Sequence, residues 1–513
     1  MARIKYKNTA DKSIARIAKK SKVYDNKYEY CKKTIYCMEK INLTNSYPIK
    51  ENVKQSNHFP SEKEAEKYLE VTNEHADEKS FLITDALDKN LLPGVENIKK
   101  DKKNIRILEI GPGGGSTLEI WRDYAKQHVN TEIDVDAIEF INKQERHSES
   151  GKKHLKALKQ NAIISIGQAQ ELPFNDNSFS AINISSVFHE VGSYDGGRKS
   201  INQALQEISR VLAPEGAVGY RDVAAPSENL NTPHQTKYIR PAWRNFIKEA
   251  APYLIENSPD FYKNKLQDVK IWQKGKKISP RDINSDEELI VEAPIGFICE
   301  IQRHYITARD HLLRHGDLGL YITKTQWVNM EEGIKQTFIK THLNSFAEEI
   351  AGEYSSGVLG DNEYIFDDGL DFDNMTDEVM QKFFKNIKKD DKKGKASFNE
   401  WLNREGHEFY FYYNISELIQ AAVKASQKNN DQHVLMPKNS EDIQTIPRYY
   451  YQRYLNDVFD NPLPDAKQLV RFWKIPKQNA KHCLEKLVEN KKLNDAMGES
   501  SKKCWKSIND LLN

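Results

Sequence analysis

The chain has 513 residues, 38% hydrophobic and 29% charged, a composition that can build buried cores. Its 76 Lys and Arg residues balance 75 Asp and Glu residues, giving a formal net charge of +1. This excludes a basic footprint over the whole chain, so nucleic acid is not a favoured partner. At about 150 residues per domain, the length predicts roughly three domains.

The sequence indicates a cytoplasmic protein. Its most apolar stretch, 289–299, is too short to span a bilayer and contains Glu292. The first 20 residues lack the apolar segment of a signal peptide. The five cysteines are few and mostly scattered, which favours a reducing compartment and no disulfide framework. They are Cys31, Cys37, Cys299, Cys483 and Cys504.

The first 100 residues are predicted to form a helical, basic region. Residues 1–40 contain 12 basic and four acidic residues, which suit either a solvated arm or a contact surface for an acidic partner. Residues 61–90 have a helical pattern. They begin with Ser61 and Glu64 at capping-box spacing.

A glycine cluster follows the first clear strand. Residues 105–110 (IRILEI) read as a short buried strand, and Gly111, Gly113 and Gly115 follow it before Ser116 begins a helix. Glycine lets the backbone turn sharply and lets a ligand approach without a Cβ atom in the way. The cluster is therefore either a structural turn or a ligand-binding loop.

The order of the later elements favours the ligand-binding loop. A second strand, 133–138, leads into Glu139, an acid placed to bind ribose hydroxyls, with Asp136 as the alternative. Residues 163–191 and 205–223 add further strands and helices. Five such units predict an α/β fold with a parallel, doubly wound sheet that binds ligands at the carboxyl ends of its strands.

Four ordered motifs carry a family resemblance. They are E-I-G-P-G-G-G at 109–115, G-Q-A-Q-E-L-P-F at 167–174, N-S-F-S-A at 177–181 and E-I-S-R-V-L-A-P-E-G at 207–216. With them, residues 105–223 resemble a class I S-adenosylmethionine-dependent methyltransferase of the type 11 kind with a Rossmann-like core. The E-L-P-F segment and the R-V-L-x-P-x-G turn distinguish this resemblance from an NAD-binding domain.

The resemblance implies S-adenosylmethionine as the cofactor and a role for each matching residue. Glu109 and the three glycines would line the methionine and ribose side, Glu139 would bind the ribose, and Gln168 and Ala169 would lie beside the adenine. Ser185, at the end of the fourth strand, completes the implied cofactor set. Two residues depart from the pattern: Gln168 is uncharged, and Ser180 stands where an acid is common.

The chemistry of transfer points to the ends of the fourth and fifth strands. Methyl transfer needs alignment of donor and acceptor, and removal of a proton from some acceptors. His189 and Glu190 are candidates for a base or a substrate ligand, the alternative being a hydrogen-bonded structural histidine. Arg221 could hold a carboxylate or phosphate, or form a salt bridge with Asp222 or another neighbour.

Several other chemistries lack their motifs. No D-P-P-Y or N-P-P-Y tetrapeptide follows the fourth strand, and no cysteine lies near the predicted site for a covalent route. We expect no metal site from the spacing of Cys and His residues. Residues 389–400 resemble a degenerate calcium loop, in which Lys389 and Lys393 occupy positions that require oxygen ligands.

The predicted enzyme is a methyltransferase with an unidentified acceptor, a small molecule or a protein. Its predicted parts are a helical basic region (1–100), the methyltransferase core (101–226), an insertion acting as lid, docking platform or dimer interface (227–405), a completion of the core sheet (406–450) that reads as strand, helix and strand from the aromatic segment onward, and a helical tail (451–513). One alternative is a protein-lysine or RNA methyltransferase that docks its substrate through the insertion and the basic arm. Another is a cofactor-binding pseudoenzyme that serves as a scaffold, and a homodimer is compatible with either.

Overall fold

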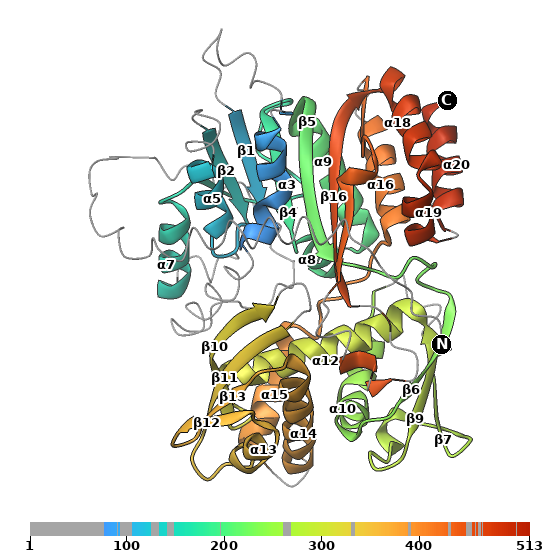
Figure 1. Ribbon diagram of the computed structural model, residues 1–513. Coiled ribbons are helices and arrows are strands. Elements are labelled where there is room, and N and C mark those ends of the chain that lie inside the picture. Colours follow the sequence, from blue (N-terminus) through green and yellow to red (C-terminus); the bar gives the residue numbers. More distant parts are fainter. Residues whose placement is uncertain are drawn as a thin grey trace.

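Figure 1 shows the computed structural model of the chain. It describes residues 76–89, 91–92, 105–124, 133–140, 148–194, 196–259, 268–329, 334–387, 391–428, 432–447, 454–456, 458–459, 463, 465–498 and 500–513. The basic arm at 1–40 and the capping box at Ser61 lie outside these residues. So do Cys31 and Cys37.

The largest sheet confirms the predicted fold class. Its strand order is β14-β16-β5-β4-β1-β2-β3, and β15 pairs with β16. The pairs from β3 to β5 are parallel, whereas β16 runs antiparallel to β5 and to β14. The strands are β1 (Ile105–Ile110), β2 (Ile133–Glu139), β3 (Ile163–Ile166), β4 (Phe179–Ser185), β5 (Leu212–Val223), β14 (His433–Met436), β15 (Ile443–Pro447) and β16 (Ala466–Pro476).

The register brings the ends of neighbouring strands together. Ile110 pairs with Ile138, and Glu139 pairs with Ile166. On the other side of β1, Ile184 of β4 also pairs with Ile110. The carboxyl ends of β1 to β4 therefore form one continuous edge, on which a ligand can contact several strands at once.

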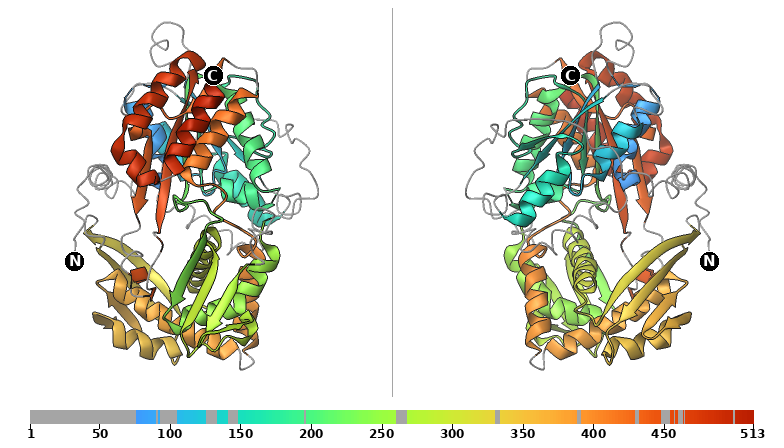
Figure 2. Two further views of the ribbon diagram at one scale, coloured as in Figure 1. Left: turned by 90° about the vertical axis from the view of Figure 1, so that its right-hand side faces the viewer. Right: turned by 90° about the vertical axis from the view of Figure 1, so that its left-hand side faces the viewer.

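Helices cover both faces of this sheet, as Figure 2 shows with α3 and α5 on the face opposite α9. The helices are α3 (Ala76–Asp88), α5 (Ser116–Tyr124), α7 (Glu149–Leu158), α8 (Phe188–Tyr194), α9 (Arg198–Val211), α16 (Ile415–Gln427), α18 (Lys477–Glu489), α19 (Lys491–Met497) and α20 (Ser500–Leu512). Helix α3, the described part of the predicted N-terminal helix, buries Leu82, Ile83, Ala86 and Leu87. It approaches β5 closely, because a Cβ atom on Gly219 would lie 3.2 Å from the Cβ of Leu82.

The insertion after β5 forms a second unit below the main sheet in Figure 1. It contains two four-stranded sheets, with orders β6-β9-β7-β8 and β10-β11-β13-β12. The strands are β6 (Pro233–Tyr238), β7 (Lys270–Gln273), β8 (Lys276–Ile278), β9 (Leu289–Pro294), β10 (Leu320–Asn329), β11 (Ile334–Thr341), β12 (Gly357–Gly360) and β13 (Glu363–Phe366). The α-helices are α10 (Pro241–Asn257), α12 (Ile295–His315), α13 (Phe346–Tyr354), α14 (Gly369–Ile387) and α15 (Lys392–Arg404).

A buried aromatic cluster holds the insertion together. Trp243 of α10 stacks on Tyr305 of α12, with ring centroids 3.7 Å apart. Its indole nitrogen donates to the hydroxyl of Tyr454 at 3.3 Å, and its ring packs against Phe459 at 4.8 Å. The chain therefore returns to the insertion after β15, before it re-enters the main sheet as β16.

Two local expectations differ from the structure. The aromatic segment 408–413 resembles a strand in sequence, but it runs as irregular chain without strand pairing. The tail is helical from α18 onward as expected, yet it also supplies β16, which is nearly all buried and pairs with β5. Because β16 contains Lys467, Gln468, Arg471 and Lys474, its sequence does not indicate a buried central strand, and its position between β5 and β14 could be assigned only from tertiary structure.

The segment that resembles a calcium loop is largely helical. Helix α15 begins at Lys392, and the side chain of Asp391 caps it by accepting from the backbone N–H of Gly394. Lys393 and Gly394 are thus in the first turn of a helix, where they cannot form the loop of an EF-hand. Lys389 lies outside the described residues.

Cys299, Cys483 and Cys504 are buried free thiols. Within the described part of the chain, none of the helices has both the length and the apolar character needed to cross a membrane.

Candidate active site

The glycine loop after β1 adopts a conformation that favours glycine. Gly111, Gly113 and Gly115 have φ values of 69°, 52° and 82°. The backbone N–H of Gly111 donates to the carbonyl of Ile138 at 3.0 Å, which ties the loop to β2. A Cβ atom on Gly111 would lie 2.5 Å from a methyl group of Val187, so this glycine is also required by packing against the end of β4.

Glu109 is fully enclosed beneath this loop. Its carboxylate accepts from the amide of Asn183 on β4 at 3.0 and 3.2 Å, and the same amide donates to the carbonyl of Lys79 on α3. Burial raises the pKa of Glu109 well above its usual range, although the Asn183 amide opposes the shift. The structure therefore places Glu109 between β1, β4 and α3.

Glu139 lies at the carboxyl end of β2, beside the glycine loop. Its carbonyl accepts from Gly167 at 3.1 Å. Within the described part of the chain, the side-chain Oε2 is buried without a hydrogen-bond donor, and the Nε2 of His154 lies 3.5 Å from it in an ion-pair position. A buried carboxylate oxygen without a partner is costly unless a ligand supplies hydrogen-bond donors.

Asp136, the alternative to Glu139, is already engaged. Its two carboxylate oxygens accept from the guanidinium of Arg106 at 2.7 and 2.8 Å. Gln168 and Ala169 follow β3 on the same edge as Glu139, and Gln168 forms an isolated bridge with Glu171.

Arg221 of β5 is held by α3. It is 4% exposed, and its Nε donates to Glu78 at 2.7 Å in a salt bridge. It also donates to the hydroxyls of Ser185 at 3.4 Å and Ser186 at 3.1 Å. This matches the salt-bridge alternative for Arg221, with Glu78 as the neighbour.

His189 occupies a buried position on α8, just after β4. Its Nδ1 lies 3.0 and 3.1 Å from the two carboxylate oxygens of Asp222 on β5, and its ring packs 4.9 Å from that of Tyr410. Burial alone lowers the pKa of His189, but the Asp222 carboxylate outweighs it and raises the pKa to about 9. The same pairing holds the pKa of Asp222 below its usual value despite burial.

Glu190 and Glu408 complete a cluster with His189. One potential ligand atom from each of these three residues lies within 4.8 Å of the other two. Burial and the Glu408 carboxylate raise the pKa of Glu190 to about 8, and the charge of Glu139 acts in the same direction. The hydroxyl of Tyr194 donates to Glu408 at 2.6 Å.

Glu300 anchors the aromatic segment from which Glu408 and Tyr410 come. It lies in α12 of the insertion, is fully buried, and accepts from the backbone N–H groups of Tyr410 and Phe411 at 2.9 Å each. Burial raises the pKa of Glu300 to about 8, although these two hydrogen bonds oppose the shift.

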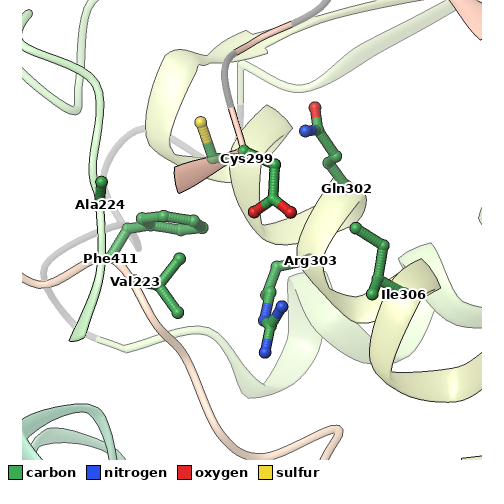
Figure 3. A pocket seen from close by; sticks show the side chains of 8 residues that line it. Val223, Ala224, Cys299, Gln302, Arg303, Ile306 and Phe411 are labelled. Carbon is green, nitrogen blue, oxygen red and sulfur yellow. The ribbon is translucent and has the colours of Figure 1, made fainter. Parts of the chain in front are cut away.

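A small pocket lies where β5 meets the insertion, as Figure 3 shows. Val223 and Ala224 line it from the end of β5, Phe411 from the aromatic segment and Arg303 from α12. It has room for about one water molecule, so it is a packing gap beside the site and too small for a substrate.

The structure thus groups the candidate residues into two parts of one edge. Gly111 to Gly115, Glu139, Gln168 and Ala169 lie at the ends of β1, β2 and β3, whereas Ser185, His189, Glu190 and Arg221 lie at β4 and β5. Sequence reasoning missed Glu78, Glu300 and Glu408. No local signal could have found them, because each meets its partner across a long sequence separation.

The comparisons with known proteins agree with this arrangement. Residues 108–219 match the profile of a family described as methyltransferase domain, which covers the glycine loop, Glu139 and the ends of β3 and β4. None of the curated proteins matches the chain.

Solved structures include three that are similar in part. An S-adenosylmethionine-dependent methyltransferase from Methanosarcina mazei shares 10% identity over 75% of this chain and 99% of that chain, with a TM-score of 0.26. DesVI from Streptomyces venezuelae shares 17% sequence identity, covering 32% of this chain and 58% of DesVI, with a TM-score of 0.21. The DszA carbon methyltransferase shares 17% sequence identity, covering 29% of this chain and 36% of that protein, with a TM-score of 0.23.

This chain spans between 32% and 59% of the length of the first five solved structures that it matches. The sheet and the glycine loop, together with the family profile, define a class I methyltransferase domain. Residues 108–219 of this chain match the methyltransferase domain family, as the sequence resemblance predicts.

Proposed function

We propose that the protein binds S-adenosylmethionine at the ends of β1, β2 and β3 and transfers its methyl group to an acceptor that approaches from the insertion. The observation that carries this proposal is the buried Oε2 of Glu139, which accepts no hydrogen bond from the described residues and has only the Nε2 of His154 nearby among them, at 3.5 Å. It lies on the same edge as the glycine loop, at the position from which an acid reaches ribose hydroxyls. The residues present therefore fit the cofactor.

We call the ends of β1, β2 and β3 the donor half of the edge, and each of its residues has a separate role in the proposal. Glu139 accepts hydrogen bonds from the ribose, and Gly113 leaves room for the ligand at the tip of the loop. Gln168 and Ala169 flank the adenine, where the amide oxygen of Gln168 can accept from an amino group. Glu109 acts indirectly, because its hydrogen bonds with Asn183 join β1 to β4 beneath the loop.

The acceptor meets the donor at the ends of β4 and β5. When bound, the cofactor supplies a methyl group on a sulfonium, which leaves alignment and proton removal to the protein. His189 and Glu190 lie on α8 at this end of the sheet, and Glu408 joins them after the insertion. We infer that residues 227–405 select and position the acceptor and leave donor affinity to the core.

Calorimetry with S-adenosylmethionine tests the donor half. Because a charged carboxylate binds hydroxyls strongly, Glu139→Ala should cost about 1.5–3 kcal/mol of binding free energy. Glu119→Ala is the matched control, since Glu119 is an exposed acid on the neighbouring helix α5. An unchanged dissociation constant in a folded Glu139→Ala variant would remove the ribose role from this residue.

The acceptor requires a separate experiment. The full chain is incubated with methyl-labelled cofactor and a lysate of its source cells, and the products are fractionated by size. Label that appears in small molecules and disappears in Glu139→Ala supports a small acceptor. Label in protein or RNA supports the macromolecular alternative, and no label from a protein that binds the cofactor supports a scaffold.

A further inference from the structure

Three potential metal ligands meet where the core faces the aromatic segment. His189 and Glu190 come from α8, and Glu408 comes from the segment that follows the insertion. Their ligand atoms lie within 4.8 Å of one another. In a tetrahedral site, two ligands at about 2.0–2.2 Å from one ion are about 3.3–3.6 Å apart, so the side chains would have to draw together by about 1 Å to bind it.

Further hydrogen bonds already orient two of these ligands. Asp222 accepts from Nδ1 of His189, which leaves Nε2 of the ring to face an ion. Tyr194 donates to one oxygen of Glu408. In metal sites, a ligand histidine usually donates its other ring N–H to a carboxylate, and a ligand carboxylate accepts a hydrogen bond. These contacts hold the metal ligands in place.

The cluster is rich in carboxyl groups, which can lose their protons to a bound cation. Asp222, Glu190 and Glu408 bring three carboxylates around one imidazole. Asp222 is 2% exposed and Glu408 is 6% exposed, so solvent screens them little. Among the nearby cations, Lys467 of β16 acts on Asp222, and Arg303 lies over the ring of Tyr410.

We propose that His189, Glu190 and Glu408 bind one divalent first-row transition metal ion and that Asp222 positions His189 for it. An imidazole with two carboxylates suits Zn²⁺, Mn²⁺, Fe²⁺ or Co²⁺ better than Ca²⁺ or Mg²⁺, which prefer oxygen ligands alone. Three protein ligands leave at least one coordination position for water or for an oxygen of the acceptor.

This inference goes beyond the proposed function. Metal binding by the cluster needs neither the cofactor nor an acceptor, so it can be tested alone. The use of the ion to hold an acceptor oxygen does depend on the proposed function. The charge of Glu139 acts on Glu190, which places the cluster close to the donor half.

The experiment titrates the metal-stripped full chain with Zn²⁺ by calorimetry and with Co²⁺ by visible absorption. Glu190→Gln and Glu408→Gln should each weaken binding at least tenfold. Glu405→Gln is the matched control, because Glu405 is a buried acid at the end of α15, three residues before Glu408 and outside the cluster, and it should bind as the unchanged protein does. Asp222→Asn should weaken binding about tenfold and shift the Co²⁺ spectrum.

Two outcomes would overturn the proposal. One is that the folded protein without substitutions binds neither ion. The other is that all the variants bind the ion equally, which would place it elsewhere, such as at Cys31 and Cys37. If Glu408→Gln does not fold, Glu190→Gln decides, since Glu190 is only partly buried. Cofactor affinity measured on the metal-stripped protein separates failure of this site from failure of the donor site.

Discussion

The two halves of the functional edge are held in different ways. In the donor half, the backbone makes the connections, since Gly111 donates to Ile138 and Gly167 donates to Glu139. In the acceptor half, buried charged side chains make them, through Arg221 and Glu78 and through His189 and Asp222. A change at Glu139 should therefore affect ligand affinity more than stability, whereas a change at Glu78 or Asp222 should lower the free energy of unfolding.

The largest expected effect follows from breaking the ion pair between Arg221 and Glu78. Glu78→Ala leaves the guanidinium of Arg221 buried without its carboxylate, and such a loss costs about 3–5 kcal/mol. The measurement is the free energy of unfolding in urea. Asp77→Asn is the control, because Asp77 is an exposed acid in the same turn of α3. A loss below about 1 kcal/mol would mean that α3 is not held to the sheet by this pair.

A smaller effect is expected where the insertion is anchored to the aromatic segment. Glu300→Leu leaves the buried N–H groups of Tyr410 and Phe411 without an acceptor, which should cost about 2–3 kcal/mol. Glu300→Gln keeps a carbonyl oxygen in place and should lose less than about 1 kcal/mol. Equal losses in the two variants would indicate that the charge of Glu300, and not its hydrogen bonds, matters here.

The same comparison explains what the sequence could predict. The donor half is a local unit in which strand, glycine turn and acid follow one another, so its residues and their side of the sheet were predictable. The acceptor half joins α3, α8, α12 and the aromatic segment, and no local pattern pairs Glu78 with Arg221 or Glu408 with His189. The strand expected at 408–413 failed for a related reason, because the N–H groups of Tyr410 and Phe411 are used by Glu300.

A substitution in the glycine loop tests whether the donor half binds S-adenosylmethionine. Gly113→Val places a side chain at the tip of the loop, so the affinity for S-adenosylmethionine should fall at least tenfold, about 1.4 kcal/mol. Gly275→Val is the matched control, because Gly275 also has a positive φ, at 71°, and open space around a Cβ atom. Calorimetry and thermal melting on both variants separate backbone strain from loss of the ligand site. Retained affinity in a folded Gly113→Val variant would contradict the assignment of this loop.

The smallest expected effect distinguishes Asp136 from Glu139 on β2. Asp136 is bound by Arg106 through two hydrogen bonds, whereas the buried Oε2 of Glu139 accepts no hydrogen bond from the described residues. Asp136→Asn should therefore lower the free energy of unfolding by about 1 kcal/mol, because a hydrogen-bonded charge is lost. It should also leave the dissociation constant for S-adenosylmethionine within about twofold, which is below 0.5 kcal/mol. The two measurements are urea unfolding and calorimetry on the same preparation. A variant that keeps its stability and loses cofactor affinity would move the ribose contact to Asp136, and the donor half would then depend on a salt bridge, as the acceptor half does.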